Sequence, residues 1–436
     1  MKGLGVWMNG EHVGTWSVGR TGNHRFEYEP SWPSHPRSRP LSLSLPFTAN
    51  NQLEGAVVKN YFDNLLPDNE SIRKRISARY KTRGIDTFTL LQAIGRDCVG
   101  AVQLLPVGQK PGDVQRLDYE KLKDEQVELL LSGLGLEAGT GAQDDDEGFR
   151  ISIAGAQEKT ALLRIGKTWC KPKGATPTTH ILKPSIGLTP GRNLDLRLSV
   201  ENEWLCNQIL GQLNLPVAHC HPAIFGHRKA LVVERFDRQW QDGGKWIVRI
   251  PQEDLCQAQG KSSDEKYESK GGPGIKDCLS VLKGSEAFES DGKHFLCAQL
   301  AFWLLAAIDG HAKNFSIFLL PGGRYRMTPL YDVLSAWPLI GTGPYHLQYK
   351  KTKLAMAVRS RAAHYRLSEI SRRHWEELAK KSGVPQVWDA LTGMIDAVEP
   401  ALQTVESRLP PGFPAKLADA VFAGTRKHLE RFRGAG

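Results

Sequence analysis

The 436-residue sequence has no run of eighteen or more consecutive apolar residues, so it predicts no membrane-spanning helix and no membrane partner. Its opening text, MKGLGVWMNGEHVG, lacks the apolar core and cleavage site of a secretory signal. Seven cysteines are scattered without a C-x-x-C pair, which argues against a disulfide or zinc framework. Internal repeats and long low-complexity segments are lacking too. We therefore expect a cytoplasmic globular protein with reduced thiols.

The composition is that of an ordinary soluble chain, with 40% hydrophobic and 24% charged residues, and its length suits two or three domains. The net charge of +10 is unevenly spread. Residues 350–436 carry sixteen Lys and Arg against nine Asp and Glu, an excess of +7. Such a basic region is compatible with a nucleic-acid footprint and with a solvated helical surface, and charge alone leaves both open.

The first 107 residues form one block, which we predict to be a β-rich N-terminal domain. Strand-like text covers residues 5–18, and the strict alternation of LSLSLPF (41–47) predicts a half-buried strand. A helical pattern over 57–80 is interrupted by Pro67, after which Asp68 or Asn69 can cap a second helix. The block closes on the apolar strand AVQLLPV (101–107).

Residues 108–148 read as a helix followed by a flexible polar connection, because EAGTGAQDDDEG cannot bury enough apolar surface to order itself. A second domain is predicted over 149–436. Its first part, to about residue 240, reads mainly as strands, and the part from 241 reads mainly as helices, with one hairpin near 315–330. This pattern predicts an α+β fold with a two-lobed core, a mostly helical C-terminal lobe and an added N-terminal domain.

The strongest catalytic signal follows an apolar helix at 295–308. The helix runs into the polar loop Asp309-Gly-His-Ala-Lys-Asn314, and polar groups beside a buried helix are costly unless they are used. Two apolar runs around the turn Pro321-Gly-Gly predict a hairpin. Because a hairpin returns the chain to its starting point, Asp332 should lie beside Asn314.

These three positions suit phosphoryl transfer from ATP. Magnesium prefers hard oxygen ligands, which Asn314 and Asp332 supply, and Asp309 can accept the proton of an attacking hydroxyl. Protein kinases use this D-x-x-x-x-N loop and a later metal-binding Asp, although Asp-Phe-Gly is absent here. An ordinary hairpin with polar turn residues explains any one position but not all three. The candidate site also includes His311, Lys313 and Tyr331.

A nucleotide also needs a cation for its phosphates. Lys183 ends the strand TTHILK, and Glu203 follows twenty residues later in a predicted helix, as in the Lys–Glu pair of protein kinases. Taken singly, each is more often an exposed charge. Small residues between two strand runs suggest a phosphate loop, although in isolation they read as a hairpin turn. The loop candidates are Ala154, Gly155, Ala156, Gln157, Glu158 and Lys159, and the adenine-linker candidates are Glu234, Arg235 and Phe236.

Several segments together resemble the HipA family, the kinase toxins of bacterial toxin–antitoxin pairs, over nearly the whole chain. The segments that carry the resemblance are RPLSLSLPF (39–47), YFDNLLPD (61–68), GRDCVGAV (95–102), ISIAGAQEKTALLR (151–164), VERFDR (233–238), IPQEDLCQ (250–257), KYESKGGPGI (266–275) and DGHAKNFS (309–316).

The resemblance implies a serine/threonine protein kinase with Asp309 as catalytic base, magnesium on Asn314 and Asp332, and the nucleotide residues in the roles given above. It implies autophosphorylation at Ser152, which ejects the phosphate loop. The implied substrate is glutamyl-tRNA synthetase, whose inactivation halts translation and promotes persistence. The implied partner is a HipB-like helix-turn-helix antitoxin, with operator DNA and the nucleoid reached through it. Contacts with DNA would come from Lys380 and Lys381.

Two other functions share part of this sequence pattern. A small-molecule phosphotransferase of the aminoglycoside- or choline-kinase type usually shows His-Gly-Asp at the loop, whereas Ala307 and Ile308 precede Asp309 here. A catalytically silent repressor subunit should have lost at least one residue of the set Lys183, Asp309, Asn314 and Asp332, and all four are present. The sequence therefore favours a protein kinase.

Overall fold

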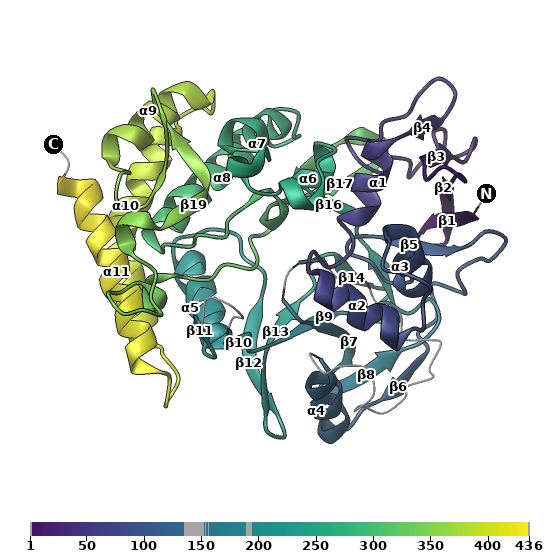
Figure 1. The fold of residues 1–436 in the computed structure, drawn as a ribbon, viewed down its shortest axis with the longest axis horizontal. Coiled ribbons are helices and arrows are strands. Elements are labelled where there is room, and N and C mark those ends of the chain that lie inside the picture. The colour runs from purple at the N-terminus through teal and green to yellow at the C-terminus, as the bar shows by residue number, and fades with distance from the viewer. Residues whose placement is uncertain (1, 135–151, 153, 156, 189–193, 435–436) are drawn as a thin grey trace. The chain divides into compact units, whose positions relative to one another are not determined.

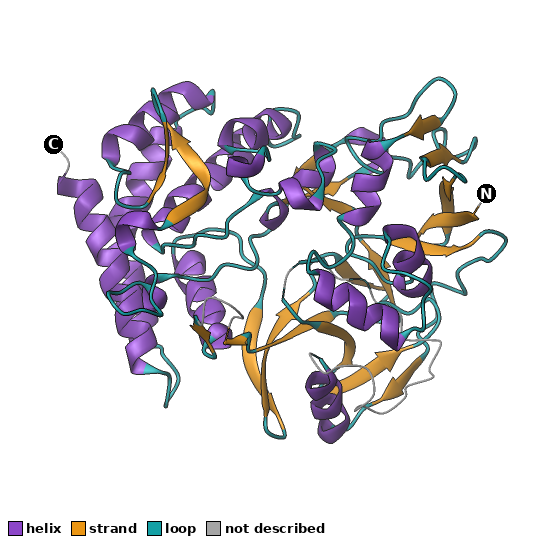
Figure 2. Ribbon diagram, viewed as in Figure 1, coloured by secondary structure: helices purple, strands orange, loops and turns teal. Residues whose placement is uncertain are grey.

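The computed structural model describes residues 2–134, 152, 154–155, 157–188 and 194–434 (Figure 1). It divides into two compact units, each built from segments that are distant in the sequence. Unit 1 comprises Met1–Pro184, Ala223–Asp264 and Ile317–Tyr325, and unit 2 comprises Ser185–Pro222, Glu265–Ser316 and Arg326–Gly436. Strands dominate the first part of the chain and helices the last, which confirms the predicted α+β class (Figure 2).

The N-terminal part of unit 1 is built on a five-stranded antiparallel sheet with the order β4-β3-β2-β1-β5. Trp16 of this sheet stacks on Phe62 with ring centroids 4.0 Å apart, and both side chains are fully buried. The β-rich character of this region is as predicted. The strands are β1 Lys2–Met8, β2 Glu11–Val18, β3 His24–Tyr28, β4 Gln52–Glu54 and β5 Val102–Pro106.

Three helices accompany this sheet: α1 Ala56–Asp63, α2 Glu70–Arg79 and α3 Thr87–Ile94. The predicted interruption at Pro67 is confirmed. Asn69 caps α2, because its side chain accepts a hydrogen bond from the N–H of Ser71.

The predicted strand at 41–47 is wrong. Leu41 and Leu45 are buried, but the segment is a turn with only an isolated bridge between Ser42 and Leu45. The hydroxyl of Ser44 donates to the carbonyl of Gln257 at 2.6 Å, and the N–H of Leu43 donates to the carboxyl of Glu253 at 2.9 Å. Partners from 253–257 thus replace those of a neighbouring strand, so alternating polarity does not require a ladder.

A six-stranded sheet forms the second layer of strands, in the order β12-β13-β9-β7-β8-β6. Helix α4 (Asp124–Gly133) packs Val127 and Leu131 against Leu162, Leu182 and Val232 of this sheet. The strands are β6 Tyr119–Lys121, β7 Thr160–Ile165, β8 Thr168–Pro172, β9 His180–Pro184, β12 Cys220–Phe225 and β13 Arg228–Glu234.

Smaller strand pairs and short helices complete the strand-rich segments. The three-stranded sheet β16-β17-β18 contains the predicted hairpin, with β17 next to β18. The bounds are β14 Arg238–Gln241, β15 Trp246–Arg249, β16 Gln252–Asp254, β17 Ser316–Leu319, β18 Tyr325–Met327 and α6 Leu255–Ala258.

Unit 2 is mainly helical. Every residue of α8 from Phe295 to Leu304 is buried, which confirms the predicted core helix. Helix α8 packs against α7, α10 and α11 (Figure 1). Trp303 stacks on His428 of α11 with ring centroids 4.3 Å apart. The helices are α5 Ser199–Gln212, α7 Ile275–Leu282, α8 Phe288–Leu304, α9 Arg372–Ser382, α10 Val387–Ser407 and α11 Ala415–Gly434.

Two hairpins and several 3-10 turns complete the described part of the chain. The hairpins are β10 Gly187–Leu188 with β11 Asp195–Leu196, and β19 Lys353–Arg359 with β20 Ala363–Arg366. The 3-10 turns span Ser263–Glu265, Glu268–Lys270, Ala312–Asn314, Pro321–Gly323, Trp337–Leu339 and Tyr349–Lys351. Within the described ranges, no helix has both the length and the apolar character needed to cross a membrane.

Candidate active site

The loop that carries Asp309 rests on the buried end of α8. After Leu304 the chain turns through Ala306, which adopts a left-handed backbone with φ +49°. At Gly310 the backbone approaches Phe302 so closely that a Cβ would lie 2.3 Å from its ring. Only glycine fits there, because real Cβ atoms do not approach other heavy atoms to this distance. The core of unit 2 therefore fixes the path of this loop.

Within the loop, Asn314 closes a small hydrogen-bonded ring. Its Nδ2 donates to the backbone carbonyl of Asp309 at 2.8 Å, and its own N–H donates to the carbonyl of His311 at 2.9 Å. The side chain is only 7% exposed. With the NH₂ group committed to Asp309, the amide presents its oxygen as the atom left for a metal or ligand.

The carboxylate of Asp309 is the exposed group of the loop, with 62% of its side chain accessible. The hydroxyl of Tyr267 donates to Oδ1, and Nε2 of His311 lies 3.9 Å from the same atom. The rings of Tyr267 and His311 meet edge to face with centroids 5.0 Å apart. One carboxylate oxygen is thus held in place while the group as a whole stays accessible, as a proton acceptor requires.

Sequence reasoning gave Tyr267 no role. Its segment, KYESKGGPGI, contributed only to the family resemblance, because 42 residues separate Tyr267 from Asp309 and no periodicity connects them. His311 and Lys313, assigned to the nucleotide site, are buried residues, only 4% and 6% exposed.

Asp332 follows a segment that is held at both sides. The N–H of Leu330 donates to the carbonyl of Pro216 at 2.8 Å, and the hydroxyl of Tyr331 donates to the carbonyl of Lys313 at 2.9 Å. This second bond joins the end of the hairpin to the Asp309 loop. Asp332 itself adopts φ +62°, a left-handed conformation that aspartate tolerates better than most residues.

The two expected metal ligands fit magnesium by their chemistry. Both Asn314 and Asp332 offer hard oxygen donors in unit 2, next to the loop that holds Asp309. Within the described residues, no cluster of three or more His, Cys, Asp or Glu side chains could hold a metal by itself. A magnesium ion at these two residues would therefore complete its shell with nucleotide phosphates and water.

Helix α5 holds Glu203, whose side chain is 6% exposed. The preceding Asn202 exchanges two 2.8 Å hydrogen bonds with the backbone of Ser335, so α5 is fixed to the segment just after Asp332. Lys183 lies in unit 1, on β9, where it faces Leu231 of β13 across the ladder and is 5% exposed. The Lys183–Glu203 pair therefore stays a prediction.

The candidate phosphate loop is described at Ala154, Gly155 and 157–159, and Ala156 lies outside the described residues. Gly155 has φ +113°, and a Cβ there would lie 2.6 Å from Nζ of Lys159. The lysine ammonium therefore lies directly against the backbone of the turn. Nε2 of Gln157 donates to the carbonyl of Pro184 at 2.8 Å, which ties the turn to the end of β9.

The same turn is anchored to the N-terminal domain. The N–H of Asp68 donates to the carbonyl of Gly155 at 3.1 Å, and Glu158 forms an ion pair with Arg75 of α2. Because the carboxylate of Glu158 is engaged by Arg75, the backbone amides and Lys159 are the groups of this turn best suited to phosphate.

The candidate adenine linker is Glu234 to Phe236. Glu234 is exposed, and Phe236 meets Phe318 edge to face at 5.7 Å. The guanidinium of Arg235 is instead buried and donates to Asp237 at 2.8 Å and to the carbonyl of Cys98 at 2.9 Å. The backbone of Arg235 is engaged as well, because its N–H donates to the carbonyl of Thr179 at 2.9 Å and its carbonyl accepts from the N–H of Arg238 at 3.2 Å. The side chain of Arg235 is therefore structural.

Arg235 belongs to a buried ion cluster that sequence reasoning missed. The cluster comprises the carboxylates of Asp97 and Asp237 and the guanidinium groups of Arg235, Arg238 and Arg249, each at most 9% exposed. Oδ1 of Asp97 accepts from Arg238 at 3.0 Å and from Arg249 at 3.1 Å. Burial alone would raise the pKa of Asp97, but the three guanidinium groups hold it below its usual range.

Ser152 lies against this cluster with no exposed surface. Its hydroxyl donates to the carbonyl of Leu65 at 2.7 Å, and its N–H donates to the carbonyl of Asp97 at 3.1 Å. Ser152 is therefore a buried serine. Phosphorylation of this hydroxyl requires the segment to leave its place, since Oγ is not accessible where it lies.

The two lysines assigned to DNA contact lie near the C-terminal end of α9. Nζ of Lys380 lies 2.8 Å from Glu376, and Nζ of Lys381 lies 2.6 Å from Glu377. Both are exposed i,i+4 pairs, which contribute little stability and can be exchanged for a phosphate. Their contact with DNA stays a prediction.

Comparison with protein families matches residues 151–405 to the HipA-like C-terminal domain and residues 4–105 to the HipA N-terminal domain. A Sinorhizobium fredii relative, named “Putative kinase Y4mE”, is 34% identical over 408 residues, 92% of this chain and 91% of that protein. The serine/threonine-protein kinase toxin HipA of Shewanella oneidensis is 30% identical over 310 residues, 68% of this chain and 66% of that protein.

One solved structure shares the fold along nearly the whole chain. It is a chain of the Shewanella oneidensis toxin–antitoxin complex of HipA, HipB and operator DNA. The TM-score is 0.80 at 24% sequence identity, over 99% of this chain and 97% of that chain.

Proposed function

Because this chain belongs to the HipA family, we propose that it is an ATP- and magnesium-dependent serine/threonine protein kinase that acts as the toxin of a toxin–antitoxin pair. The observation that supports this best is the geometry of the Asp309–Asn314 loop. An exposed carboxylate and a buried, oriented amide are built into one six-residue turn. Kinases need this combination of a proton acceptor and a metal ligand.

In the proposed reaction, a serine or threonine hydroxyl of the substrate approaches the carboxylate of Asp309, which accepts its proton. The hydrogen bond from Tyr267 holds that carboxylate in one orientation. General-base catalysis of this kind typically contributes about 10²- to 10⁴-fold. The hydroxyl oxygen would bond to the γ-phosphorus of ATP as the bond to ADP breaks and ADP leaves. Asn314 and Asp332 would hold a magnesium ion that offsets the phosphate charge.

The positively charged groups for the nucleotide are on unit 1. Lys183 lies near the end of β9, and Lys159 lies over the turn at Gly155. Each is a point charge suited to phosphate oxygens. Phe236 would border the adenine, with Glu234 and Arg235 of the same linker beside it.

The proposed substrate is glutamyl-tRNA synthetase, and the proposed partner is a HipB-like helix-turn-helix antitoxin that brings the protein to operator DNA at the nucleoid. The first rests on the family resemblance. The second is supported by the HipA, HipB and operator DNA complex whose HipA fold this chain shares. Lys380 and Lys381 would add salt-dependent phosphate contacts.

The test is phosphate transfer from labelled ATP with magnesium, glutamyl-tRNA synthetase and its tRNA. Asp309→Asn should abolish transfer without unfolding the protein, because the side chain is exposed and the fold holds the loop by its backbone. Asp389→Asn, at an exposed position of α10, is the matched control and should transfer normally.

The outcomes separate the rival functions. Label on the synthetase with wild type alone supports both reaction and substrate, and label only on the kinase redirects the search to another protein. If ATP binds but no label appears on any protein, the result favours the hypothesis of a catalytically silent repressor subunit. Transfer to an aminoglycoside or choline instead would identify a small-molecule phosphotransferase.

A further inference from the structure

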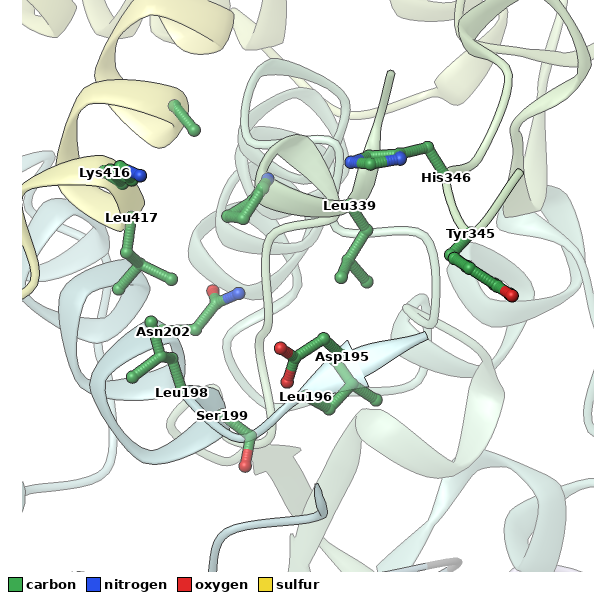
Figure 3. Close-up of a pocket in the computed structure, with 12 residues that line it drawn as sticks. Asp195, Leu196, Leu198, Ser199, Asn202, Leu339, Tyr345, His346, Lys416 and Leu417 are labelled. Atoms are coloured by element: carbon green, nitrogen blue, oxygen red, sulfur yellow. The ribbon is translucent and has the colours of Figure 1, made fainter. Parts of the chain in front are cut away.

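Unit 2 contains a cavity of about 370 Å³ that includes none of the residues assigned to the kinase reaction (Figure 3). Its apolar walls come from three segments: Leu196 and Leu198 before α5, Leu339 after Asp332, and Leu417 on α11. This volume falls within the range of small-molecule sites, about 300–1,000 Å³.

Exposed apolar side chains gather around this cavity. The described residues include eight large apolar side chains that are exposed, and four of them lie in this region. Leu198 and Tyr345 line the cavity itself, Leu188 lies in β10, which pairs with β11, and Ile186 directly precedes β10. Scattered exposed residues need no explanation, but such a concentration marks a binding surface. The four are Ile186 (37% exposed), Leu188 (62%), Leu198 (40%) and Tyr345 (59%).

The polar groups of the cavity floor are already satisfied. The hydroxyl of Ser199 accepts from the N–H of Ile186 at 2.9 Å, and the amide of Asn202 is committed to Ser335. The carboxylate of Asp195 is bound by the guanidinium of Arg197, with Nε at 2.9 Å and Nη2 at 2.6 Å. None of these groups calls for a ligand of its own.

Lys416, at the margin of the cavity on α11, is different. Within the described residues its ammonium forms no ion pair or hydrogen bond. His346 lines the cavity on another side (Figure 3). Because Arg197 offsets Asp195, the charge that remains at the cavity is positive. An apolar chamber with a cation at its edge complements an apolar molecule that carries one negative charge.

We propose that this cavity binds a small monoanion with an apolar body, such as a medium-chain carboxylate. Its tail would lie among the four leucines and its carboxylate beside Lys416. The cavity is lined by Ser199 and Asn202 at the start of α5, the helix that carries Glu203. It is also lined by Leu339, which follows the Ser335 backbone that Asn202 binds. A ligand there would stabilise one position of Glu203 and thereby change the rate of phosphoryl transfer. This effect on the rate rests on the proposed function.

The experiment measures binding of octanoate to the full chain by calorimetry and thermal shift, with octanol and octylamine as uncharged and cationic probes of matched length. Octanoate should bind saturably at one site and raise Tm, and octylamine should not bind. Lys416→Gln should weaken octanoate binding about fivefold, the scale of one exposed charge pair, without changing octanol binding. Lys276→Gln, an exposed lysine of α7, is the matched control and should bind as wild type.

A second variant, Ala420→Leu, fills the cavity from α11 and should abolish binding while the far-UV circular dichroism stays unchanged. If that variant misfolds, Lys416→Gln still decides, because Lys416 is exposed. The proposal is overturned if octanoate does not saturate, if octylamine binds equally well, or if Lys416→Gln binds as wild type. If octanoate binds but does not change the rate of phosphate transfer, the cavity is a binding site without an effect on the kinase reaction. If the wild-type protein binds octanoate but transfers no phosphate, only the proposed function is overturned.

Discussion

Replacing Asp97 by Asn tests the buried ion cluster of unit 1. The side chain of Asp97 is 7% exposed and accepts hydrogen bonds from Arg238, Arg249 and both the N–H and the hydroxyl of Thr178. The asparagine is isosteric, so the change removes a charge rather than volume. Three buried guanidinium groups would then face the single carboxylate of Asp237.

The magnitude follows from the burial. Removing one partner of a buried ion pair costs about 3–5 kcal/mol, because the remaining charge stays desolvated without its counterion. An exposed pair loses far less, since water replaces the partner. Asp195→Asn, which breaks the exposed pair with Arg197, is therefore the matched control and should change stability little.

Urea unfolding followed by tryptophan fluorescence gives the free energies, and hydrogen exchange of the amides near residue 97 assigns the transition to unit 1. The pH dependence supplies a second check. The folded-state pKa of Asp97 is lowered, so its stabilisation is present above the unfolded pKa of about 3.9 and is lost as pH falls through the folded value. The difference between wild type and variant should therefore shrink in acid.

The reasoning is refuted if Asp97→Asn lowers the free energy of unfolding by less than about 1 kcal/mol at pH 7, a loss no larger than that of a surface pair. A functional consequence accompanies the stability change. Because the carbonyl of Asp97 accepts from the N–H of Ser152, loosening the cluster should release the Ser152 segment and increase phosphate at that serine.

Three further predictions concern single groups. Burial raises the pKa of Glu253 to about 8, so the free energy of unfolding should fall as pH rises from about 4.5 to 8. Glu253→Gln should remove this pH dependence and raise the free energy of unfolding by about 3 kcal/mol at pH 7. Urea unfolding at several pH values measures both effects, and a variant with the same pH dependence as wild type contradicts the prediction. Tyr267→Phe removes the hydrogen bond to the carboxylate of Asp309 and should lower kcat about tenfold, with the KM for ATP unchanged. An unaltered kcat in phosphate-transfer assays would show that the tyrosine has no catalytic effect. Ser152→Ala should lower the free energy of unfolding by about 1 kcal/mol, because the hydrogen bond to the carbonyl of Leu65 is lost. The variant should no longer phosphorylate itself but should still transfer phosphate to its substrate. If peptide mapping of the wild type finds phosphate only at other residues, Ser152 is not the target.

The local parts of the site were predictable because their signals are local. A buried helix, a polar loop and a glycine turn follow one another between residues 295 and 332, so hydrophobic pattern and turn chemistry suffice to predict the helix and the hairpin. The same reasoning failed at 41–47, where polarity alternates but the hydrogen-bond partners come from residues 253–257. Periodicity reports which side chains are buried, not which groups satisfy the backbone.

By itself, the sequence determined the α+β class, the D-x-x-x-x-N loop with its later Asp, and the resemblance to one family. Only the tertiary structure decided that the guanidinium of Arg235 joins Asp97, 138 residues away, and that the hydroxyl of Tyr267 joins Asp309. It also decided that Ser152 is buried and that three distant segments enclose a cavity. Hydrogen bonds and ion pairs act over a few ångströms in space regardless of separation along the chain, so no local pattern in one sequence records them.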